Sequence, residues 1–192
     1  MSYNDVEVSN IVVSGNVSVE LDIEQLPELD ANGWSIEFKD VRPLGTELKY
    51  KDYPTINCHG TGAYIIRSPS RDELREVNKA FVKLMYDKGI IDDIRDPEFS
   101  VKNVVGTITL DYEVNLLNFN RDNLLNSNYE PEQFPAVSFK PDEVDVNFNI
   151  FKSGKVVVQG ADDEEELEKA SRFIQDELED YKIDSKYTDL LS

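Results

Sequence analysis

The chain has 192 residues, a formal net charge of −19 at pH 7 and 40% hydrophobic residues, which suits one large domain or two small ones. A single cysteine, Cys58, and a single histidine, His59, exclude an internal disulfide framework and argue against a zinc site or a Ser/His/Asp triad. No apolar run approaches the roughly 20 residues of a membrane span, and the first residues lack the features of a signal peptide. We therefore expect a cytoplasmic protein with no membrane contact.

The acidic balance alone argues against nucleic acid as a partner. Lys and Arg side chains that neutralise phosphates supply most non-specific binding, and this chain has 20 of them against 39 Asp and Glu. A strong negative charge is more typical of solubility, a basic protein partner or a salt-rich cytoplasm. The motifs have to decide between these interpretations.

The first half of the chain begins with a predicted strand, because residues 6–21, VEVSNIVVSGNVSVEL, alternate between polar and apolar side chains. Residues 59–74, HGTGAYIIRSPSRDEL, predict a turn at Gly62, a short strand, and a helix that begins near Ser68 or Ser70. The apolar positions of this helix have the spacing of a buried face and are Leu74, Val77, Phe81 and Leu84.

The second half repeats this order of elements. Residues 99–114, FSVKNVVGTITLDYEV, predict a strand, and residues 151–167, FKSGKVVVQGADDEEEL, predict a turn, a strand and a helix with Asp162 as its N-cap. The matched positions are Asn10 with Asn103, 93 residues apart, and Gly62 with Gly154, 92 residues apart. The buried face of the second helix is predicted at Leu167, Ala170, Ile174 and Leu178.

Each half therefore predicts a strand, a short helix, hairpin-linked strands and a long helix, which is an α+β arrangement of antiparallel strands with helices on one face. The opposite face of the sheet is left open. Alternation places Asn103, Val105 and Thr107 on one side of their strand, and Lys155, Val157 and Gln159 on one side of theirs. The ordinary interpretation of such a face is a solvated sheet surface.

Three segments of the second half resemble the TATA-binding protein (TBP) family, most closely its archaeal form. They are NVVGT at 103–107, YEPEQFPA at 129–136 and FKSGKVVVQGA at 151–161. The resemblance extends over about residues 6–182 and is strongest in the second half. It implies a TBP-like saddle, in which a curved antiparallel sheet with helices on its convex face is repeated about a pseudo-two-fold axis. The implied division is a divergent first repeat at 1–95, a second repeat at 96–182 and an acidic C-terminal tail at 183–192.

The resemblance also implies which residues contact DNA. Phe134 and Phe151 match wedges that insert between base steps at a kink, although either could instead be a core phenylalanine. The two matched asparagines correspond to donors to base-edge acceptors in the minor groove, the valines to apolar contacts with the groove floor, and the lysines to phosphate contacts. Each of these lysines could instead be an ordinary solvated surface residue. The full set is Asn10, Val12, Ile65, Asn103, Val105, Phe134, Lys140, Phe151, Lys155, Val157 and Gln159.

The function implied by the resemblance is that of a general transcription initiation factor. The turn that holds Glu130, Glu132 and Gln133 matches the family's docking site for the factor TFB, called TFIIB in eukaryotes. The protein would bind A·T-rich promoter DNA in the minor groove, and would recruit TFB and, indirectly, RNA polymerase. We expect no enzymatic activity, no cofactor and no metal. In an archaeon the protein would be cytoplasmic and associated with the nucleoid, and in a eukaryote it would be nuclear.

Departures from the family pattern keep a second hypothesis open. His59 stands where the second half has Phe151, and the other wedge position of the first half offers Arg42 or Leu44 but no phenylalanine. Further polar or unusual substitutions are Asn57, Arg67, Ala136, Asn149 and Gln159. The alternative is a divergent paralogue with weakened or lost DNA binding, which acts as a protein adaptor or antagonist through TFB or another basic partner.

Overall fold

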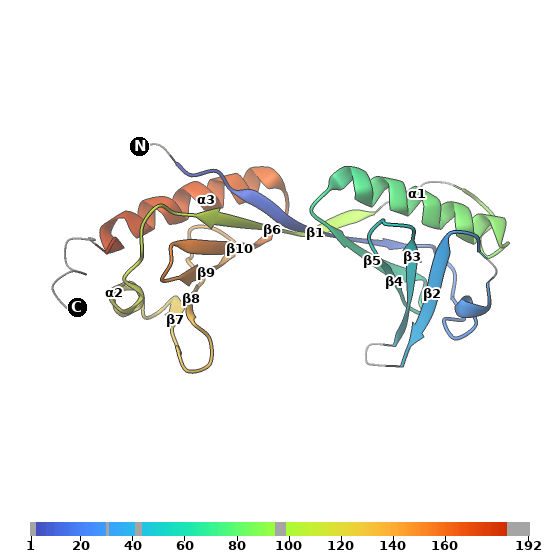
Figure 1. The fold of residues 1–192 in the computed structure, drawn as a ribbon, viewed down its shortest axis with the longest axis horizontal. Coiled ribbons are helices and arrows are strands. Elements are labelled where there is room, and N and C mark those ends of the chain that lie inside the picture. Colours follow the sequence, from blue (N-terminus) through green and yellow to red (C-terminus); the bar gives the residue numbers. More distant parts are fainter. Residues whose placement is uncertain (1–2, 30, 41–43, 95–98, 184–192) are drawn as a thin grey trace. The chain divides into compact units, whose positions relative to one another are not determined.

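The computed structural model describes most of the chain, namely residues 3–29, 31–40, 44–94 and 99–183. Arg42 and nearly all of the predicted C-terminal tail lie outside the described residues. The chain forms two compact units (Figure 1). The first unit is residues 10–102, and the second unit is residues 1–9 together with residues 103–192. The boundaries fall inside strand β1 (Glu7–Asn16) and strand β6 (Ser100–Thr109).

The first unit is an antiparallel sheet with one long helix on one face (Figure 1). Its strands run in the order β2-β3-β4-β5-β1. The remaining elements of this unit are η1 (Leu26–Glu28), β2 (Trp34–Lys39), β3 (Gly45–Tyr50), β4 (Ile56–Cys58), β5 (Ala63–Ser68) and α1 (Arg71–Asp87). Tyr64 and Ile66 of β5 are buried with the predicted apolar face of α1. The hydroxyl of Tyr64 donates to Oδ1 of Asn78 at 2.6 Å, which satisfies both polar groups in the core.

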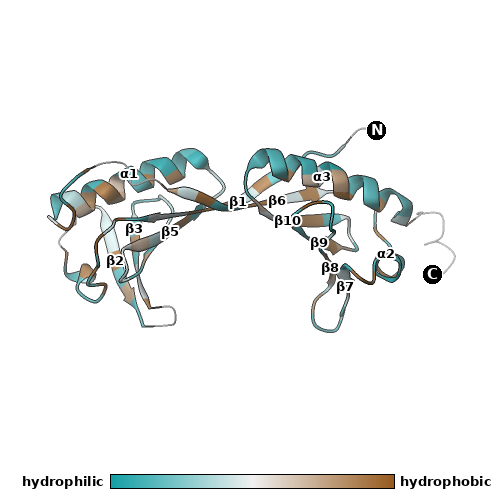
Figure 2. Ribbon diagram, turned by 180° about the vertical axis from the view of Figure 1, so that it is seen from behind, coloured by the Kyte–Doolittle hydropathy of each residue, from teal (hydrophilic) through white to brown (hydrophobic). Residues whose placement is uncertain are grey.

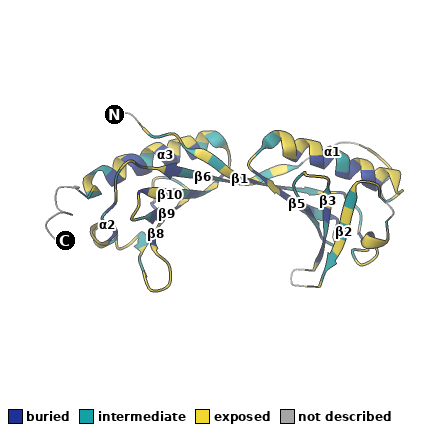
Figure 3. Ribbon diagram, in the orientation of Figure 1, coloured by how far each residue is buried: buried dark blue, intermediate teal, exposed yellow. Residues whose placement is uncertain are grey.

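The second unit has the same construction, with strands in the order β6-β10-β9-β8-β7. Its elements after β6 are α2 (Leu116–Asp122), β7 (Ser127–Asn128), β8 (Ala136–Phe139), β9 (Asn147–Phe151), β10 (Lys155–Ala161), α3 (Glu164–Leu178) and η2 (Glu179–Tyr181). In Figure 3 the buried stretches of α1 and α3 face the strands, and the exposed stretches face away from them. Figure 2 shows the matching alternation of hydrophobic and hydrophilic bands around both helices. The predicted α+β architecture is therefore correct for each unit.

The residues that begin the two long helices correct one prediction. Ser70 is the N-cap of α1, and its side chain accepts a hydrogen bond from the backbone N–H of Glu73. The cap of α3 is Asp163 and not Asp162, because Oδ1 of Asp163 accepts from the N–H of Glu166 at 2.8 Å. The N–H of Asp162 instead donates to the Glu166 carboxylate at 2.7 Å. The Glu166 side chain thus reaches back to the residue before the cap, and the helix starts one residue later than predicted.

Burial and strand register show how closely the two units repeat each other. Every buried position of α3 lies 93 residues after a buried position of α1. The pairs are Leu74 with Leu167, Val77 with Ala170, Asn78 with Ser171, Phe81 with Ile174, Val82 with Gln175, and Met85 with Leu178. In the sheets, Asn57 lies between Ile65 and Glu47, just as Asn149 lies between Val157 and Ser138. This register makes Glu47 the counterpart of Ser138.

The turn between β9 and β10 gives a stability prediction. Gly154 has a φ of +83°, and an added Cβ would lie 2.2 Å from the carbonyl oxygen of Tyr112. Gly154→Ala should lower the free energy of unfolding by about 3 kcal/mol or more, because a left-handed residue costs about 1–2 kcal/mol before the steric clash is added. Gly89→Ala is the matched control, since Gly89 has a φ of +68° with nothing within 4 Å of its added Cβ. Urea unfolding would contradict this account if the two variants lost equal stability.

Candidate nucleic-acid interface

The face of the second unit that α3 does not cover carries most of the predicted site. Val104 and Ile108 of β6 are buried toward the helix, whereas Asn103, Val105 and Thr107 are partly exposed on the other side. Cross-strand pairing extends this face over β10 and β9. The pairs are Val105 with Gln159, Thr107 with Val157, Thr109 with Lys155, and Val157 with Asn149. The structure therefore brings Val105, Val157, Gln159 and Lys155 together on adjacent strands.

Asn103 is held in a defined orientation by a β-bulge. The pairing of β10 with β6 shifts register between Gln159 and Ala161, which leaves Gly160 as the extra residue at a φ of +104°. The backbone N–H of Gly160 donates to Oδ1 of Asn103 at 2.9 Å. The amide nitrogen of Asn103 is thereby directed away from this bond. Sequence reasoning missed this contact, although the break in alternation at Gly160 was a signal for it.

Phe134 and Phe151 form an aromatic pair at the edge of this face. Phe134 is 42% exposed, and its ring centroid lies 5.9 Å from that of Phe151 with the ring planes at 70°. Phe151 is partly exposed at the end of β9, opposite Ala136 at the start of β8. The alternative that both rings belong to the core is therefore wrong. The edge-to-face geometry of this pair is a favourable aromatic contact.

The turn before Phe134 is organised by Glu130. Its carbonyl oxygen accepts hydrogen bonds at 2.9 Å from the N–H groups of both Gln133 and Phe134. Its carboxylate accepts a further bond from the side-chain amide of Gln133 and another, at 3.2 Å, from that of Asn128. Glu132 is exposed. Glu130 and Gln133, two of the three predicted partner-binding residues, thus shape the turn.

The two predicted lysines differ in their surroundings. Lys140 donates to the carboxylate of Asp145 at 3.1 Å, and both side chains are exposed. Lys155 is exposed and forms no ion pair within the described residues. An exposed pair contributes little to stability, so it would not hold Lys140 against a competing anion. Of the two lysines, only Lys140 already has a carboxylate partner among the described residues, so Lys155 is the more available to an anionic ligand.

The open face of the first unit is more acidic. Asn10 and Val12 are partly exposed on β1, and Ile65 lies on the same face, opposite both Ser14 and Asn57. The row continues outward through Glu47 to Glu37. Lys39 lies 2.7 Å from the carboxylate of Glu37 and 3.5 Å from that of Glu47. Sequence reasoning missed this charge cluster because residues 34–59 carried no recognisable motif.

The described edge of the first unit differs from the matching edge of the second. His59 occupies the position of Phe151, and its Nδ1 lies 3.0 Å from the carbonyl oxygen of Leu44. The same register places the counterpart of Phe134 at Pro43, which is outside the described residues. Leu44, one of the predicted substitutes, is 46% exposed. The described edge of this unit therefore presents an imidazole bonded to the backbone and one aliphatic side chain.

Within the described ranges, no group of three or more His, Cys, Asp or Glu residues could hold a metal ion. Burial raises the pKa of the Cys58 thiol, so this group stays protonated at neutral pH. No described helix has the length and hydrophobicity to span a bilayer. The open face of the second unit thus presents amides, apolar side chains and Lys155, and that of the first unit adds the carboxylates of Glu37 and Glu47.

Comparison with known proteins identifies relatives over most of the chain. The family described as "Transcription factor TFIID (or TATA-binding protein, TBP)" matches residues 98–181. TATA-box-binding protein C of Halobacterium salinarum is 34% identical over 91% of this chain and 98% of the relative. TATA-box-binding protein of Methanocaldococcus jannaschii is 28% identical over 92% of this chain and 94% of the relative. A solved structure, Methanococcus jannaschii TBP, covers 93% of this chain and 99% of its own at a TM-score of 0.73 and 26% identity. These matches confirm the predicted resemblance and fold class.

The exposure of Phe134 gives a prediction that separates surface from core aromatics. Phe134→Ala should cost about 1 kcal/mol or less of unfolding free energy, because the ring is already partly in water. Phe148→Ala is the matched control, since Phe148 is fully buried on the neighbouring β9 and its loss should cost about 3–5 kcal/mol. Chemical denaturation measures both. A cost for Phe134→Ala equal to that of the control would return this ring to the core.

Proposed function

Since this chain belongs to the TATA-binding protein family, we propose that it is a transcription initiation factor that binds A·T-rich promoter DNA in the minor groove through the open faces of its sheet. The observation that carries this proposal is the exposed aromatic pair Phe134 and Phe151 at the edge of an uncovered sheet face. Neither ring is among the buried core residues of the second unit. A wedge that replaces lost base stacking at a kink does need them; the handling of DNA by wedge insertion is an established property of this family.

The rest of the second-unit face fits a minor groove of A·T pairs. This groove presents only acceptors on its A·T edges, and G·C adds the guanine amino donor. The outward amide nitrogen of Asn103 can donate to those acceptors, and Val105 and Val157 are apolar neighbours that would lose packing against a protruding amino group. Lys155 can approach the backbone phosphates. The proposed contact set is Asn10, Val12, Ile65, Asn103, Val105, Phe134, Lys140, Phe151, Lys155, Val157 and Gln159.

We further propose that the turn of Glu130, Glu132 and Gln133 docks TFB, which then brings RNA polymerase. The internal bonds of Glu130 fix the shape of this turn, and Glu132 is exposed for a basic partner. In this proposal the protein is not an enzyme, uses no cofactor, and acts in the cytoplasm on nucleoid DNA. We also propose that residues 1–95 and 96–182 are the two repeats of the sequence, and that the acidic tail predicted at 183–192 is part of neither.

A second candidate function is that of an adaptor or antagonist that binds TFB but not DNA. The observation in its favour is the first-unit face, where Glu37 and Glu47 lie in the row that would approach the DNA. His59 is bonded to the backbone of Leu44 and offers no wedge. The net charge of −19 adds a general repulsion of phosphates. We favour DNA binding that is completed by phosphate contacts from TFB.

The wedge role predicts a specific loss of DNA binding. Phe134→Ala and Phe151→Ala should each weaken retardation of an A·T-rich duplex, in the presence of TFB, by about tenfold to a hundredfold, because stacking on an aromatic ring contributes about 1–3 kcal/mol per base. Leu117→Ala is the matched control for removal of an exposed apolar side chain in the same unit, since Leu117 is 72% exposed on α2. TFB binding without DNA should be unchanged in all three variants.

The same experiment decides between the two candidates. Retardation that weakens as salt rises supports DNA binding, because phosphate neutralisation releases counterions. If no duplex is retarded while TFB still binds, the adaptor function replaces the initiation function. If both phenylalanine variants retard the duplex as the wild type does, the wedge role is wrong whichever function holds.

The difference between the units predicts a kink at one end of the DNA site only. An A·T-rich duplex with 2-aminopurine near one end or the other reports unstacking as a rise in fluorescence. We expect the rise at one probe position, and its loss in Phe151→Ala, because Phe151 has only His59 as its counterpart. Equal rises at both positions would show that the first unit inserts a side chain despite this substitution.

A further inference from the structure

The second unit pairs a short piece of its own chain with the segment that follows β6. After α3 the chain turns back through η2 and forms a β-bridge, in which Lys182 is antiparallel to Val114. Two backbone hydrogen bonds at 2.8 Å flank this pair, from the N–H of Ile183 to the carbonyl of Glu113 and from the N–H of Asn115 to the carbonyl of Tyr181. The bridge therefore has the hydrogen-bond pattern of an antiparallel ladder.

The matching edge of the first unit has no such partner among the described residues. Leu21 lies 93 residues before Val114, and the N–H of each donates at 2.9 Å to the turn between β4 and β5 or between β9 and β10. The carbonyl of Glu20 and the N–H of Asp22 correspond to the two bridge-forming groups of the second unit. Neither forms a hydrogen bond with a described residue. Two backbone groups that are paired in one repeat are therefore open in the other.

The end of α1 explains why this edge stays open. In the second unit α3 ends at Leu178, and the chain then turns to the bridge. In the first unit α1 continues past Met85, the counterpart of Leu178, and ends at Asp87. Gly89, at a φ of +68°, then closes a Schellman motif in which the N–H of Ile90 donates to the carbonyl of Met85 at 2.9 Å. The segment whose counterpart forms the bridge is thus bonded to its own helix.

A hollow of about 510 Å³ lies beside the open edge. Its lining is Glu20, Leu21, Asp22, Gln25, Leu26, Glu28, Leu29 and Ile90. The N–H of Leu26 donates to the carbonyl of Asp22 as that of Phe119 donates to that of Asn115, so Leu26 is the counterpart of Phe119. In the second unit the ring of Tyr181 packs edge-on against Phe119 at 5.1 Å. The hollow therefore adjoins the position that a tyrosine ring takes in the second unit.

The charged side chains that line this hollow are all negative. Glu20, Asp22 and Glu28 are exposed, and none of them forms an ion pair with a described residue. Glu113, the counterpart of Glu20, is by contrast paired with Lys152 at 3.6 Å. No described lysine or arginine lines the hollow. The edge therefore favours a basic occupant, because complementary charge selects partners and fixes their register.

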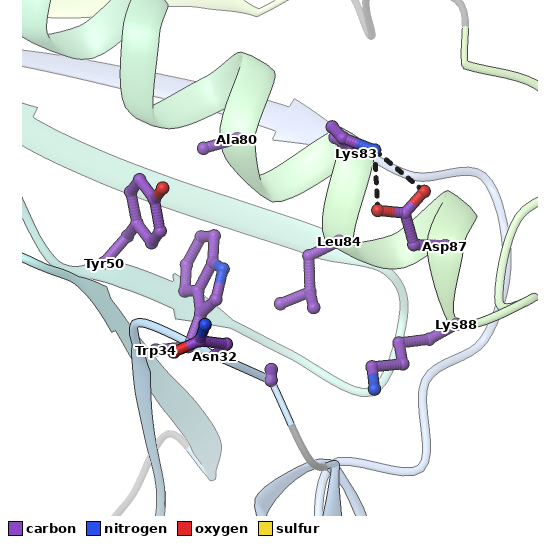
Figure 4. Close-up of a pocket in the computed structure, with 9 residues that line it drawn as sticks. Asn32, Trp34, Tyr50, Ala80, Lys83, Leu84, Asp87 and Lys88 are labelled. Atoms are coloured by element: carbon purple, nitrogen blue, oxygen red, sulfur yellow. Dashed lines mark hydrogen bonds and ion pairs between the residues drawn. The ribbon is translucent and has the colours of Figure 1, made fainter.

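A second hollow of the same unit differs in its charges. It lies between α1 and the β2–β3 hairpin, beside Trp34 and Tyr50 (Figure 4). Lys83 is paired with Asp87 in its lining at 2.7 Å. The two hollows share no lining residue. Unpaired carboxylates without a neighbouring cation are thus a property of the open edge and not of both hollows.

We propose that residues 20–22 bind an extended segment of a partner protein in which an aromatic residue, a lysine and an aliphatic residue follow one another. The segment adds a strand to the edge, a known mode of peptide recognition. Its backbone accepts from the N–H of Asp22 and donates to the carbonyl of Glu20. Its aromatic ring enters the hollow against Leu26, and lysines beside the ring meet the unpaired carboxylates. The order of residues copies the segment 181–183, which fills the same place in the second unit.

The backbone bonds can be tested on the peptide, so that the protein stays intact. The probe is a fluorescein-labelled peptide, Lys-Tyr-Lys-Ile-Lys, titrated with the full chain at physiological ionic strength. We expect a saturable rise in anisotropy. Methylation of the Ile nitrogen should weaken binding about tenfold, because it removes the donor to the Glu20 carbonyl. Methylation of the central Lys nitrogen is the matched control, since the N–H of the residue paired with Leu21 points away from the edge. No saturable rise, or equal affinities of the two methylated peptides, would overturn the proposal.

The charge of the edge is tested by Glu28→Lys, which should weaken binding of the unmethylated peptide about fivefold. Asp52→Lys is the matched control, because Asp52 is exposed in the same unit, does not line the hollow and gives the same change in net charge. Equal affinities of the two variants would overturn the proposal. If circular dichroism shows that Glu28→Lys does not fold, the methylated peptides decide with the wild-type chain. If the chain alone dimerises in sedimentation and Glu28→Lys makes it monomeric, a second copy is the occupant and the proposal is wrong.

Discussion

The structure depends on one constraint, which is that each antiparallel sheet buries only the face beneath its helix. Side chains alternate along a strand, so each strand contributes one set to the core and leaves the other set outside. In β10 the buried set is Val156 and Val158, and the uncovered set is Lys155, Val157 and Gln159. A second helix layer would have made the whole strand apolar. In the part of the chain that the structure describes no such layer covers the second set, so these alternate positions can serve a ligand; the strand residues of the candidate DNA site are drawn from them, whereas Phe134 and Lys140 flank β8.

Repetition of one plan allowed the two units to diverge without loss of the fold. Each of the six buried positions of α3 lies 93 residues after a buried position of α1, and these shared positions preserve the core of each unit, whereas the seventh buried position of α1, Leu84, corresponds to the exposed Glu177. Positions outside this set differ in residue type between the two units. At the sheet edge His59 is the counterpart of Phe151, and on the helix Ala80 is the counterpart of Phe173. The first unit therefore has an imidazole at the sheet edge where the second unit has the ring of Phe151.

Much of this could be predicted from the sequence, because periodicity and motif act locally. The buried stripes of both helices, the open sides of β6 and β10, and the exposure of Phe134 follow from spacing or from the family motif. The N-cap of α3 was predicted one residue too early, because the sequence does not distinguish Asp162 from Asp163 until the hydrogen-bond partner of the Glu166 N–H is known. The cluster of Glu37, Lys39 and Glu47 depends on pairing between strands, which no single segment encodes.

The bond between Gly160 and Asn103 has a consequence for how that side chain can discriminate. An asparagine amide that is free to rotate by 180° can present either its oxygen or its nitrogen, and so tolerates donors and acceptors alike. Here the oxygen is already engaged by the backbone, so rotation would break a hydrogen bond worth about 1 kcal/mol and leave the N–H of Gly160 unsatisfied. The side chain therefore favours a ligand acceptor opposite its amide nitrogen and disfavours a ligand donor in the same place. The backbone of Gly160 in β10 thus determines that Asn103 in the neighbouring strand β6 presents a donor to a ligand.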